Sequence, residues 1–350
     1  MIDIQNLSVE LGVFALHDIC LNINKGEYFI ILGPTGAGKT ILLESIAGVQ
    51  PIKTGQIWLE GKDITGMKPE ERRASIVYQD YMLFPHYSVR ENILFGLKMR
   101  RENTDQLTLG LNRVVQLLGI EHLLLRRPDT LSGGEKQKVA LARAIVTGPG
   151  VLLLDEPLSA LDPQTRENVR EEILKLHDRL GLTVLHVTHD FEEAITMGNR
   201  IAVIGEGAIK QVGIPDEIFR RPNSEFVARF TMAGNILSGV AMKDKDGTTA
   251  FVVDGAKFTV DSNMEGPCQA SIRPEDILIS RAMATSDGYN HFTAVITQIV
   301  NKGSVVNVTA NLPPPLTCLL TRHSFEEMGL TVGQQAYVTF SPSSVHLFSS

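Results

Sequence analysis

Eight residues near the start of the chain, GPTGAGKT at positions 33–40, have the types and spacing that bind phosphate groups. They fit the pattern G-x-x-x-x-G-K-[ST], in which glycines let successive backbone N–H groups face the α- and β-phosphates of a nucleotide. Lys39 would then reach the β- and γ-phosphates, and the Thr40 hydroxyl would bind Mg²⁺. The alternative is a glycine-rich turn that matches the pattern by chance.

Two adjacent carboxylates follow an apolar run much later in the chain, in the segment VLLLDEP at positions 151–157. Asp155 suits a Mg²⁺ contact, made directly or through water. Glu156 could act as a general base on the water that attacks the γ-phosphate, or could orient that water. The alternative is a pair of solvated acids at the end of a strand.

The residues around both segments predict the elements that position them. The apolar run Tyr28–Leu32 predicts a buried strand, and residues 41–47 begin a helix whose N-terminus favours anions. Residues 151–154 predict a second strand with the two carboxylates at its carboxyl end, where open α/β sheets bind ligands. Apolar residues at helical spacing predict a helix over residues 165–180. These alternating elements indicate an α/β fold.

Several further motifs stand in one order along residues 1–222, and together they resemble the ATPase subunits of ATP-binding cassette (ABC) transporters. Gln79 lies in VYQDYMLFPHYSVRENILFG, where that family has its Q-loop, and LSGGE at positions 131–135 resembles its signature loop. The segment SALD at positions 159–162 resembles the loop that crosses the dimer interface. His189, in VLHVTHD, matches the family's switch histidine.

The resemblance implies a role for each of these residues. It makes Glu156, His189, Lys39 and Gln79 catalytic, and it makes Thr40, Gln79 and Asp155 the Mg²⁺ ligands. The implied cofactors are ATP and Mg²⁺. The implied nucleotide contacts are Gly33, Pro34, Thr35, Gly36, Ala37, Gly38, Lys39, Thr40, Ile41, Ser132, Gly133, Gly134 and Phe14.

Two positions depart from the family's pattern or match it ambiguously. Many members carry a second hydroxyl residue after the Mg²⁺ ligand, whereas this chain has Ile41, so only backbone contacts to the α-phosphate are expected there. The family stacks adenine on an aromatic residue near the N-terminus. Phe14 is the nearest candidate, and Leu11 is the alternative position for that role.

The signature loop predicts that the chain acts as a homodimer. Ser132 precedes an apolar and basic helix, so its loop forms an anion site that would duplicate the phosphate-binding segment within one chain. If two chains pack head to tail, each ATP is held between one chain's GPTGAGKT segment and the other chain's LSGGE. Hydrolysis would then release the two chains.

Composition restricts the class of protein and its location. At 350 residues and 43% hydrophobic content, the chain can form two or three domains, and its three cysteines show no metal or disulfide pattern, which fits a reducing cytoplasm. A net charge of −7 and a pI near 5.8 argue against binding to nucleic acid. No run approaches the ~18 apolar residues of a membrane span, and no secretory signal is recognisable.

We therefore expect a peripheral protein on the cytoplasmic face of the membrane. Two integral-membrane permease subunits would supply the transport pathway, and an extracytoplasmic substrate-binding protein would act with them indirectly. A helical insert at about residues 81–150 is the expected docking surface, with Tyr81, Phe84 and Tyr87 exposed to receive a short permease helix. The alternative, strongest for Phe84, is that these aromatic residues pack into the insert's own core.

Helical periodicity nearly disappears after Pro222, and short β-rich runs appear instead, at residues 250–253, 257–260, 294–300 and 305–310. We predict an ABC nucleotide-binding domain over residues 1–232 and an all-β small-barrel domain over residues 233–350. In the latter, SIRPEDILIS at 271–280 resembles a segment of the accessory barrel of import ATPases. AGNILSGV, FTAVITQIVNKGSVVNVTA and MGLTVGQQAYVTFSPSSVHLF resemble molybdate-binding (Mop-like, TOBE) modules, although the usual S-A-R-N is here M-A-G-N, from Met232 to Asn235.

The second resemblance implies a binding site for molybdate or tungstate as a regulatory ligand. A tetrahedral oxyanion needs N–H and hydroxyl donors with one or two cations, and the candidates are Asn235, Arg273, Lys302, Gly303 and Ser304. A solvated hairpin turn is the alternative for the segment NKGS at 301–304. Oxyanion bound there could hold the cassettes apart and inhibit import by feedback.

These observations predict an ATP-hydrolysing subunit of an ABC importer, with molybdate or tungstate as the favoured cargo. Import of sulfate, polyamine or sugar is the first alternative, because the cassette motifs do not report cargo. A cassette ATPase of DNA repair or translation is the second, opposed by the acidic pI, the single cassette and the β-rich tail.

Overall fold

The structure is a computed structural model that describes residues 1–244, 247–282 and 288–349. The chain divides into two compact units, Met1–Pro215 and Asp216–Ser350. The first contains all of the predicted nucleotide-site residues, and the second contains the β-rich tail. The division falls ahead of the boundary at 232/233 that we predict from sequence, because helices α7 (Pro215–Arg220) and α8 (Glu225–Phe230) group with the tail.

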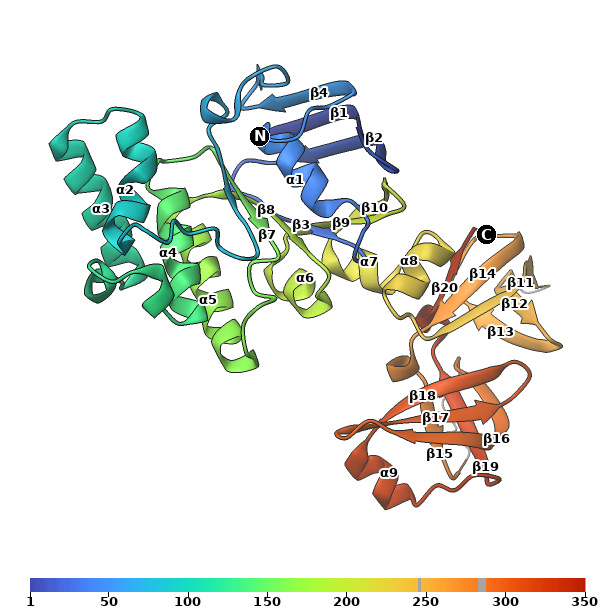
Figure 1. The fold of residues 1–350 in the computed structure, drawn as a ribbon. Coiled ribbons are helices and arrows are strands. Elements are labelled where there is room, and N and C mark those ends of the chain that lie inside the picture. Colours follow the sequence, from blue (N-terminus) through green and yellow to red (C-terminus); the bar gives the residue numbers. More distant parts are fainter. Residues whose placement is uncertain (245–246, 283–287, 350) are drawn as a thin grey trace. The chain divides into compact units, whose positions relative to one another are not determined.

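The first unit is built around a six-stranded sheet with the strand order β10-β9-β3-β8-β7-β6 (Figure 1). Five of its strands are parallel and only the edge strand β10 is antiparallel. The strands are β3 (Tyr28–Leu32), β6 (Ala74–Val77), β7 (Val151–Asp155), β8 (Thr183–Thr188), β9 (Arg200–Gly205) and β10 (Ala208–Gly213).

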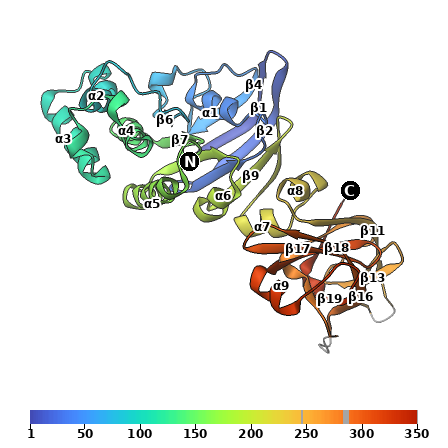
Figure 2. The same ribbon diagram turned by 60° about the horizontal axis from the view of Figure 1, so that its bottom comes forward.

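A four-stranded antiparallel sheet with the order β2-β1-β4-β5 covers one side of this unit. Its strands are β1 (Ile2–Leu11), β2 (Phe14–Ile23), β4 (Thr54–Leu59) and β5 (Lys62–Asp63). Helix α1 (Lys39–Ala47) shares one buried core with this sheet and with β3, β7, β8 and β9. Figures 1 and 2 both show α1 on one face of the parallel sheet and α5 and α6 on the other.

The remaining helices of the first unit lie on that other face or form the insert. The insert consists of α2 (Val89–Met99), α3 (Thr104–Leu118) and α4 (Gly133–Ile145), followed after β7 by α5 (Pro163–Leu180) and after β8 by α6 (Phe191–Met197). Short 3₁₀ turns occur at Pro69–Glu71, Glu121–Leu123 and Pro128–Thr130. The prediction of an α/β cassette with a helical insert is confirmed.

The second unit consists of two five-stranded antiparallel sheets that share a single buried core. One has the order β13-β12-β11-β14-β20, from β11 (Asn235–Lys243), β12 (Thr249–Val253), β13 (Ala256–Val260), β14 (Gly266–Ile272) and β20 (Val345–Phe348). The other has the order β15-β19-β16-β17-β18, from β15 (Leu278–Ser280), β16 (Asn290–Asn301), β17 (Val305–Asn311), β18 (Pro315–Thr321) and β19 (Gln335–Phe340). The aromatic rings of Phe258, Phe292 and Phe340 meet edge to face or stacked between the sheets.

The prediction of a β-rich small-barrel domain is confirmed, with helical elements added. Helix α9 (Arg322–Met328) follows β18, and 3₁₀ turns occur at Pro274–Asp276 and Pro342–Ser344. Thr321 caps α9 by accepting a hydrogen bond from the Ser324 backbone N–H, and Gly329 ends it in the left-handed conformation. Among the described residues we find no helix that combines the length and apolar character needed to span a membrane.

Candidate functional site

The predicted catalytic residues converge because four neighbouring parallel strands end at one edge of the sheet. In spatial order, β3 leads into the phosphate-binding segment, β8 into His189, β7 into Asp155 and Glu156, and β6 towards Gln79. The carboxyl ends of parallel strands form the ligand-binding edge of an open α/β sheet. The fold therefore collects at one edge residues that lie more than a hundred positions apart in sequence.

The phosphate-binding segment has the backbone that its glycines predict. Gly36 and Gly38 adopt left-handed φ angles of 83° and 97°. At Gly38 a Cβ atom would lie 2.6 Å from carbon atoms of both Leu16 and Phe14, so no larger residue fits. Helix α1 begins directly after Gly38, and neither a side-chain cap nor an acidic residue occupies its first turn. Its first N–H groups are thus suited to receive an anion.

Around this helix start, five side chains form a polar cluster made of two adjacent sets of contacts. Lys39 Nζ donates hydrogen bonds to the carbonyl oxygens of Gly33 and Pro34, at 2.8 and 3.0 Å, and lies 3.8 Å from Glu156 Oε1. The same Glu156 oxygen lies 3.1 Å from His189 Nδ1. Thr40 Oγ1 donates a hydrogen bond of 3.1 Å to Asp155 Oδ1. A hydroxyl and a carboxylate oxygen this close are the oxygen donors that Mg²⁺ prefers, so these residues fit the ion.

Burial changes the electrostatics of two members of the cluster. Desolvation lowers the pKa of the Lys39 ammonium, although the charges of Glu156 and Asp155 oppose this effect. Desolvation likewise raises the pKa of the Asp155 carboxyl, against the hydrogen bond from Thr40. Because each group carries its charge at a cost, both are prepared to gain from an oppositely charged partner. Glu156 also has a left-handed φ of 45°, which marks backbone strain at this site.

Strand β8 holds the two neighbouring loops in place through its backbone. The Thr188 carbonyl accepts a hydrogen bond of 3.4 Å from the Gly33 N–H, and the Val187 carbonyl accepts one of 3.0 Å from the Glu156 N–H. The residues just before His189 thus fix the phosphate-binding segment and Glu156. The sequence pattern gave no sign of this backbone role for Thr188.

The signature loop lies away from this cluster, against another set of residues. Ser132 caps α4 by accepting a hydrogen bond from the Glu135 N–H at 3.3 Å, while a Glu135 carboxylate oxygen accepts one from the Ser132 N–H at 2.7 Å. A Cβ atom on Gly133 would meet Leu161, and one on Gly134 would meet Thr165. The loop therefore packs beside SALD and the start of α5, with Ser132 and Gly133 exposed.

The insert corrects one expectation about its aromatic residues. Tyr81 is 8% exposed rather than available at the surface, while Tyr87 is 41% exposed. Tyr81 is buried because its backbone turns with a left-handed φ of 63° and its carbonyl accepts a hydrogen bond from Arg143 on α4. Phe84 packs against Tyr87 and Phe95, so the alternative of an internal cluster describes it better. Gln79 lies exposed just beyond β6.

Phe14 lies at the start of β2 and is partly buried beside Gly38. Its ring touches the phosphate-binding segment from the side of the four-stranded sheet and belongs to the rim of that core. Leu11 is 47% exposed at the end of β1. The stacking role of Phe14 stays a prediction.

In the second unit, the five predicted oxyanion residues do not form one cluster. Asn235 is 6% exposed, and its side-chain amide is hydrogen-bonded to backbone groups. Its Nδ2 donates to the carbonyl oxygens of Ile272 and Thr317, and its Oδ1 accepts from the Thr317 N–H. Asn235 thus joins the two sheets. Gly303 and Ser304 are exposed in the β16–β17 turn, where the Gly303 N–H donates to Asn301 Oδ1.

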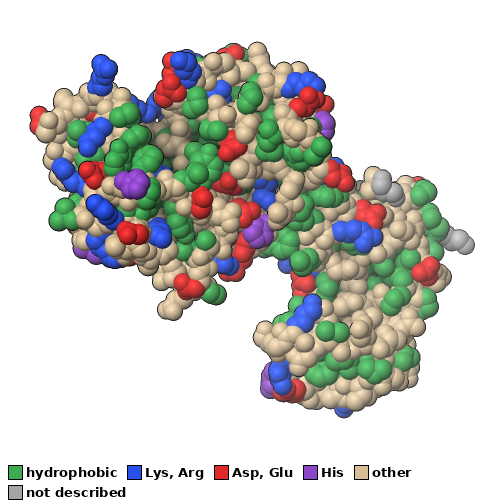
Figure 3. Space-filling view, viewed as in Figure 1, with side chains coloured by type: hydrophobic (Ala, Val, Ile, Leu, Met, Phe, Trp, Pro, Cys, Tyr) green, Lys and Arg blue, Asp and Glu red, His purple; other side chains and the backbone are tan. Residues whose placement is uncertain are grey.

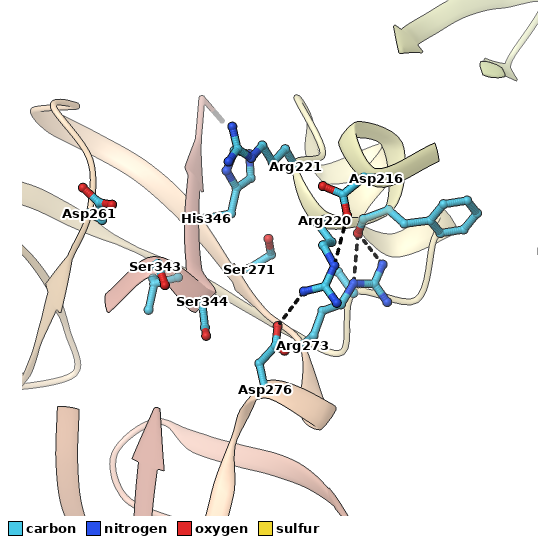
Figure 4. Close-up of a pocket in the computed structure, with 13 residues that line it drawn as sticks. Asp216, Arg220, Arg221, Asp261, Ser271, Arg273, Asp276, Ser343, Ser344 and His346 are labelled. Atoms are coloured by element: carbon cyan, nitrogen blue, oxygen red, sulfur yellow. Dashed lines mark hydrogen bonds and ion pairs between the residues drawn. The ribbon is translucent and has the colours of Figure 1, made fainter. Parts of the chain in front are cut away.

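Arg273 and Lys302 line two different pockets of this unit. Arg273 lies in a cavity of about 520 Å³, where its guanidinium donates to the Phe219 carbonyl oxygen (Figure 4). Arg220, in the same cavity, is paired with Asp216 and Asp276 at 3.2 and 3.7 Å. Lys302 lies in a second pocket, of about 510 Å³, whose lining also includes Arg229, Asn307 and Thr317.

The face shown in Figure 3 carries basic and acidic side chains interspersed over both units.

Within the described residues, no group of three or more histidine, cysteine, aspartate or glutamate side chains could hold a metal ion. The Mg²⁺ candidates are of another kind, because they combine a hydroxyl, an amide and a single carboxylate.

Comparison with known proteins agrees with this geometry. The ABC transporter family matches residues 16–159, and the TOBE domain family matches residues 286–347. A molybdate/tungstate import ATP-binding protein of Pyrococcus abyssi is 42% identical over 349 residues, covering 99% of this chain and 100% of that protein. A spermidine/putrescine import ATP-binding protein of Clostridium novyi is 42% identical over 285 residues, covering 80% of each.

Among solved structures, a dimeric post-hydrolysis state of an ATP-binding cassette bound to ADP and Pi aligns with a TM-score of 0.55 and 27% identity. The alignment covers 61% of this chain and 99% of that one. The nucleotide edge of the sheet and the signature loop thus define an ATP-binding cassette, and the chain belongs to the ABC transporter family. It is the ATPase subunit of an importer and carries a TOBE domain.

Proposed function

We propose that the importer carries molybdate or tungstate. The observation that supports this most directly is the 42% identity to the molybdate/tungstate import protein of Pyrococcus abyssi, which extends over the cassette and the tail alike. A relationship confined to the cassette would say little about cargo, since the nucleotide-site residues act on ATP in every importer.

The hydrolytic step would use the residues at the sheet edge. Lys39 and the start of α1 would hold the phosphates. Thr40, Asp155 and Gln79 would hold Mg²⁺, which would supply positive charge beside the phosphate oxygens. Glu156 is the general base that takes a proton from the attacking water. His189, 3.1 Å from Glu156, would contact the γ-phosphate and keep the carboxylate oriented.

The assembly would be a homodimer bound to two integral-membrane permease subunits at the cytoplasmic face of the membrane. The exposed Ser132–Gly133 loop lies beside SALD rather than beside this chain's own phosphate-binding segment, so a second copy is needed to present it to ATP. The alignment with a dimeric cassette supports the same arrangement. An extracytoplasmic substrate-binding protein would deliver cargo to the permeases.

The tail would bind the transported oxyanion and inhibit import by feedback. Of its two pockets, the one lined by Lys302 is the better anion site, because Arg220 and Arg273 in the other already bind protein groups. Asn307 and Thr317 add amide and hydroxyl donors beside Lys302. Glu275 also lines this pocket and opposes an anion, although it lies 3.5 Å from Arg273.

Polyamine import is the second candidate, because the spermidine/putrescine import protein of Clostridium novyi has the same identity over a shorter span. The two candidates differ in the charge of the cargo. Molybdate and tungstate are anions, which Lys302 would attract, whereas a polyamine is a cation, which Lys302 would repel.

Calorimetric titration of the full chain with molybdate, tungstate, sulfate and spermidine would separate these proposals. We expect binding of molybdate and tungstate, and a loss of affinity of about tenfold, or ~1.4 kcal/mol, in Lys302→Ala. Lys257→Ala is the matched control, because Lys257 is an exposed lysine of the same unit that pairs with Asp244. Stronger binding of spermidine than of molybdate would contradict the cargo, and equal affinities in wild type and Lys302→Ala would remove Lys302 from the site.

A further inference from the structure

A buried chain of three polar side chains crosses the cassette below His189. The Tyr28 hydroxyl lies 3.0 Å from His186 Nδ1, and His186 Nε2 lies 3.3 Å from Glu193 Oε2. These residues are 1%, 0% and 3% exposed, and they come from β3, β8 and α6. Hydrolysis as described above uses none of them directly, and burying such polar groups is costly unless they pair with one another.

The carboxylate end of this chain is held in its charged form. Burial raises the pKa of Glu193, but the neighbouring His186, Thr188 and Arg166 lower it by more, so the net shift is downward. Removing either His186 or Glu193 would leave the other side chain buried without this polar neighbour. The 3.3 Å approach of His186 Nε2 to Glu193 Oε2 is a polar contact between β8 and α6, although neither atom has a hydrogen bond of regular geometry among the described residues.

Glu193 is also bound to both neighbours of His189. The Thr188 side chain is a polar neighbour of the Glu193 carboxyl and lowers its pKa, and its Oγ1 accepts a hydrogen bond from the Asp190 N–H at 3.0 Å. Asp190 Oδ1 in turn accepts from the Glu193 N–H at 3.1 Å. His186 comes three residues before His189 and Glu193 four residues after it. The pair thus closes a ring of contacts around the segment that carries the switch histidine.

His189 itself needs such support from below. Its side chain is 52% exposed, and the contact that orients it is the one with Glu156. Residues packed around the ring add to its stiffness: Arg166 lies 3.8 Å from Asp190, Arg170 pairs with Glu192, and Met197 Sδ and the His177 ring contact Tyr28.

We propose that the buried Tyr28–His186–Glu193 chain positions His189 for hydrolysis. The chain fixes α6 to β8 so that the His189 imidazole meets Glu156, and through Thr188 it keeps this loop in register with Gly33. The three residues are positioning residues that do not touch the nucleotide. The inference rests on the proposed role of His189 and goes beyond it by naming what holds that residue in place.

The test is the steady-state ATPase of the full chain with Glu193→Gln and His186→Gln. Because each replacement loosens the His189 loop while leaving the phosphate-binding segment intact, we expect kcat to fall roughly tenfold to a hundredfold. The Kd for ATP should stay within about twofold of wild type. The double variant should be no slower than the slower single one, because the two residues act as one unit.

Val184→Ala is the matched control for a general loss of stability. Val184 is 1% exposed on the same strand and lies on the same face as His186. It stands opposite Tyr28 in the β3–β8 register, but its apolar side chain can take part in none of the hydrogen bonds described above. It should lower the melting temperature without lowering kcat below that temperature. If it lowers kcat as much as Glu193→Gln does, the effect is one of stability and the inference is overturned. Should the two amide variants fail to fold, Tyr28→Phe removes one hydroxyl only and should lower kcat about threefold.

His189→Ala separates this inference from the function on which it rests. Loss of turnover in His189→Ala together with wild-type kcat in Glu193→Gln and His186→Gln would overturn the positioning role and leave the proposed mechanism standing. Wild-type turnover in His189→Ala would instead contradict the role of His189 itself.

Discussion

The nucleotide edge of the cassette and the oxyanion candidates of the tail were predicted from the same sequence. The structure brings the first set of residues together and leaves the second set apart. At the cassette edge, the candidates form a cluster of two adjacent sets of contacts, Lys39–Glu156–His189 and Thr40–Asp155. In the tail, Asn235 joins the two sheets through hydrogen bonds, and Arg273 and Lys302 line different pockets. Gly303 and Ser304 lie in an exposed turn.

The difference arises from how each site is encoded. The residues of the cassette site belong to short contiguous motifs, and each motif follows a parallel strand. The order of the strands in the sheet therefore brings the motifs together. The tail candidates come from strand ends and turns of two antiparallel sheets. The register of strand pairing decides on which face of its sheet each of these side chains lies, and a single sequence does not reveal that register.

The largest effect that tests this contrast is expected at Glu156. Glu156→Gln keeps the shape of the side chain but removes the proposed general base, so turnover should fall about 10²- to 10⁴-fold while ATP binding is retained. Phosphate release measures the first quantity and nucleotide calorimetry the second. Size-exclusion chromatography with ATP should show an accumulated dimer.

Glu206→Gln is the control for Glu156→Gln, since the Glu206 side chain is 79% exposed and pairs with Lys210. It should hydrolyse ATP as wild type does. Undiminished phosphate release by Glu156→Gln would mean that the connected cluster is not the catalytic site.

Local sequence predicted the elements of the cassette closely, because long apolar runs and glycine signals decide them without tertiary information. The strand predicted at Tyr28–Leu32 matches β3, and the helix predicted over residues 165–180 is α5 (Pro163–Leu180). In the tail, the run at 257–260 is part of β13 and the run at 305–310 is part of β17. Alternating apolar residues on a half-buried strand carry this signal.

What local sequence could not predict depends on contacts between distant residues. Tyr81 looks like an exposed aromatic in a polar segment, yet Arg143, sixty-two positions later, binds its carbonyl and the turn buries the ring. Asn235 looks like an anion ligand, yet Thr317 on a strand of the other sheet takes up its amide. Helix α9 has only seven residues, too few for helical periodicity to stand out.

The next largest effect is expected at Asn235, and it tests whether this residue joins the two sheets or binds an oxyanion. Asn235→Ala leaves the half-buried N–H and C=O of Thr317 and the carbonyl of Ile272 without their side-chain partner, so the tail should lose about 1–3 kcal/mol of stability. Hydrogen exchange of β18, followed by mass spectrometry, measures this loss within the tail.

Asn311→Ala is the matched control, because Asn311 is exposed at the end of β17, in the same sheet as β18. It should leave β18 exchange unchanged. Normal β18 protection in Asn235→Ala, combined with loss of oxyanion binding, would restore Asn235 as a ligand and make the tail site resemble the cassette site after all.

The smallest effect is a pH dependence confined to the tail, and it comes from His346 on β20. Burial lowers the pKa of this histidine, the neighbouring Arg221 lowers it further, and the bond of its Nε2 to the Pro222 carbonyl at 3.0 Å opposes the shift only in part (Figure 4). Because the pKa is lower in the folded than in the unfolded chain, protonation favours unfolding. His346 therefore contributes stability above the ordinary histidine pKa, and this contribution is lost as the pH falls through the folded pKa.

Wild type should lose at most about 1 kcal/mol of tail stability between pH ~8 and pH ~5 through this group, and His346→Gln should lack that part of the dependence. Hydrogen exchange of β20 at both pH values measures the difference. His323→Gln is the control, since His323 is 82% exposed at its side chain, and it should keep the wild-type dependence. If His346→Gln and wild type lose equal stability on acidification, another tail group titrates.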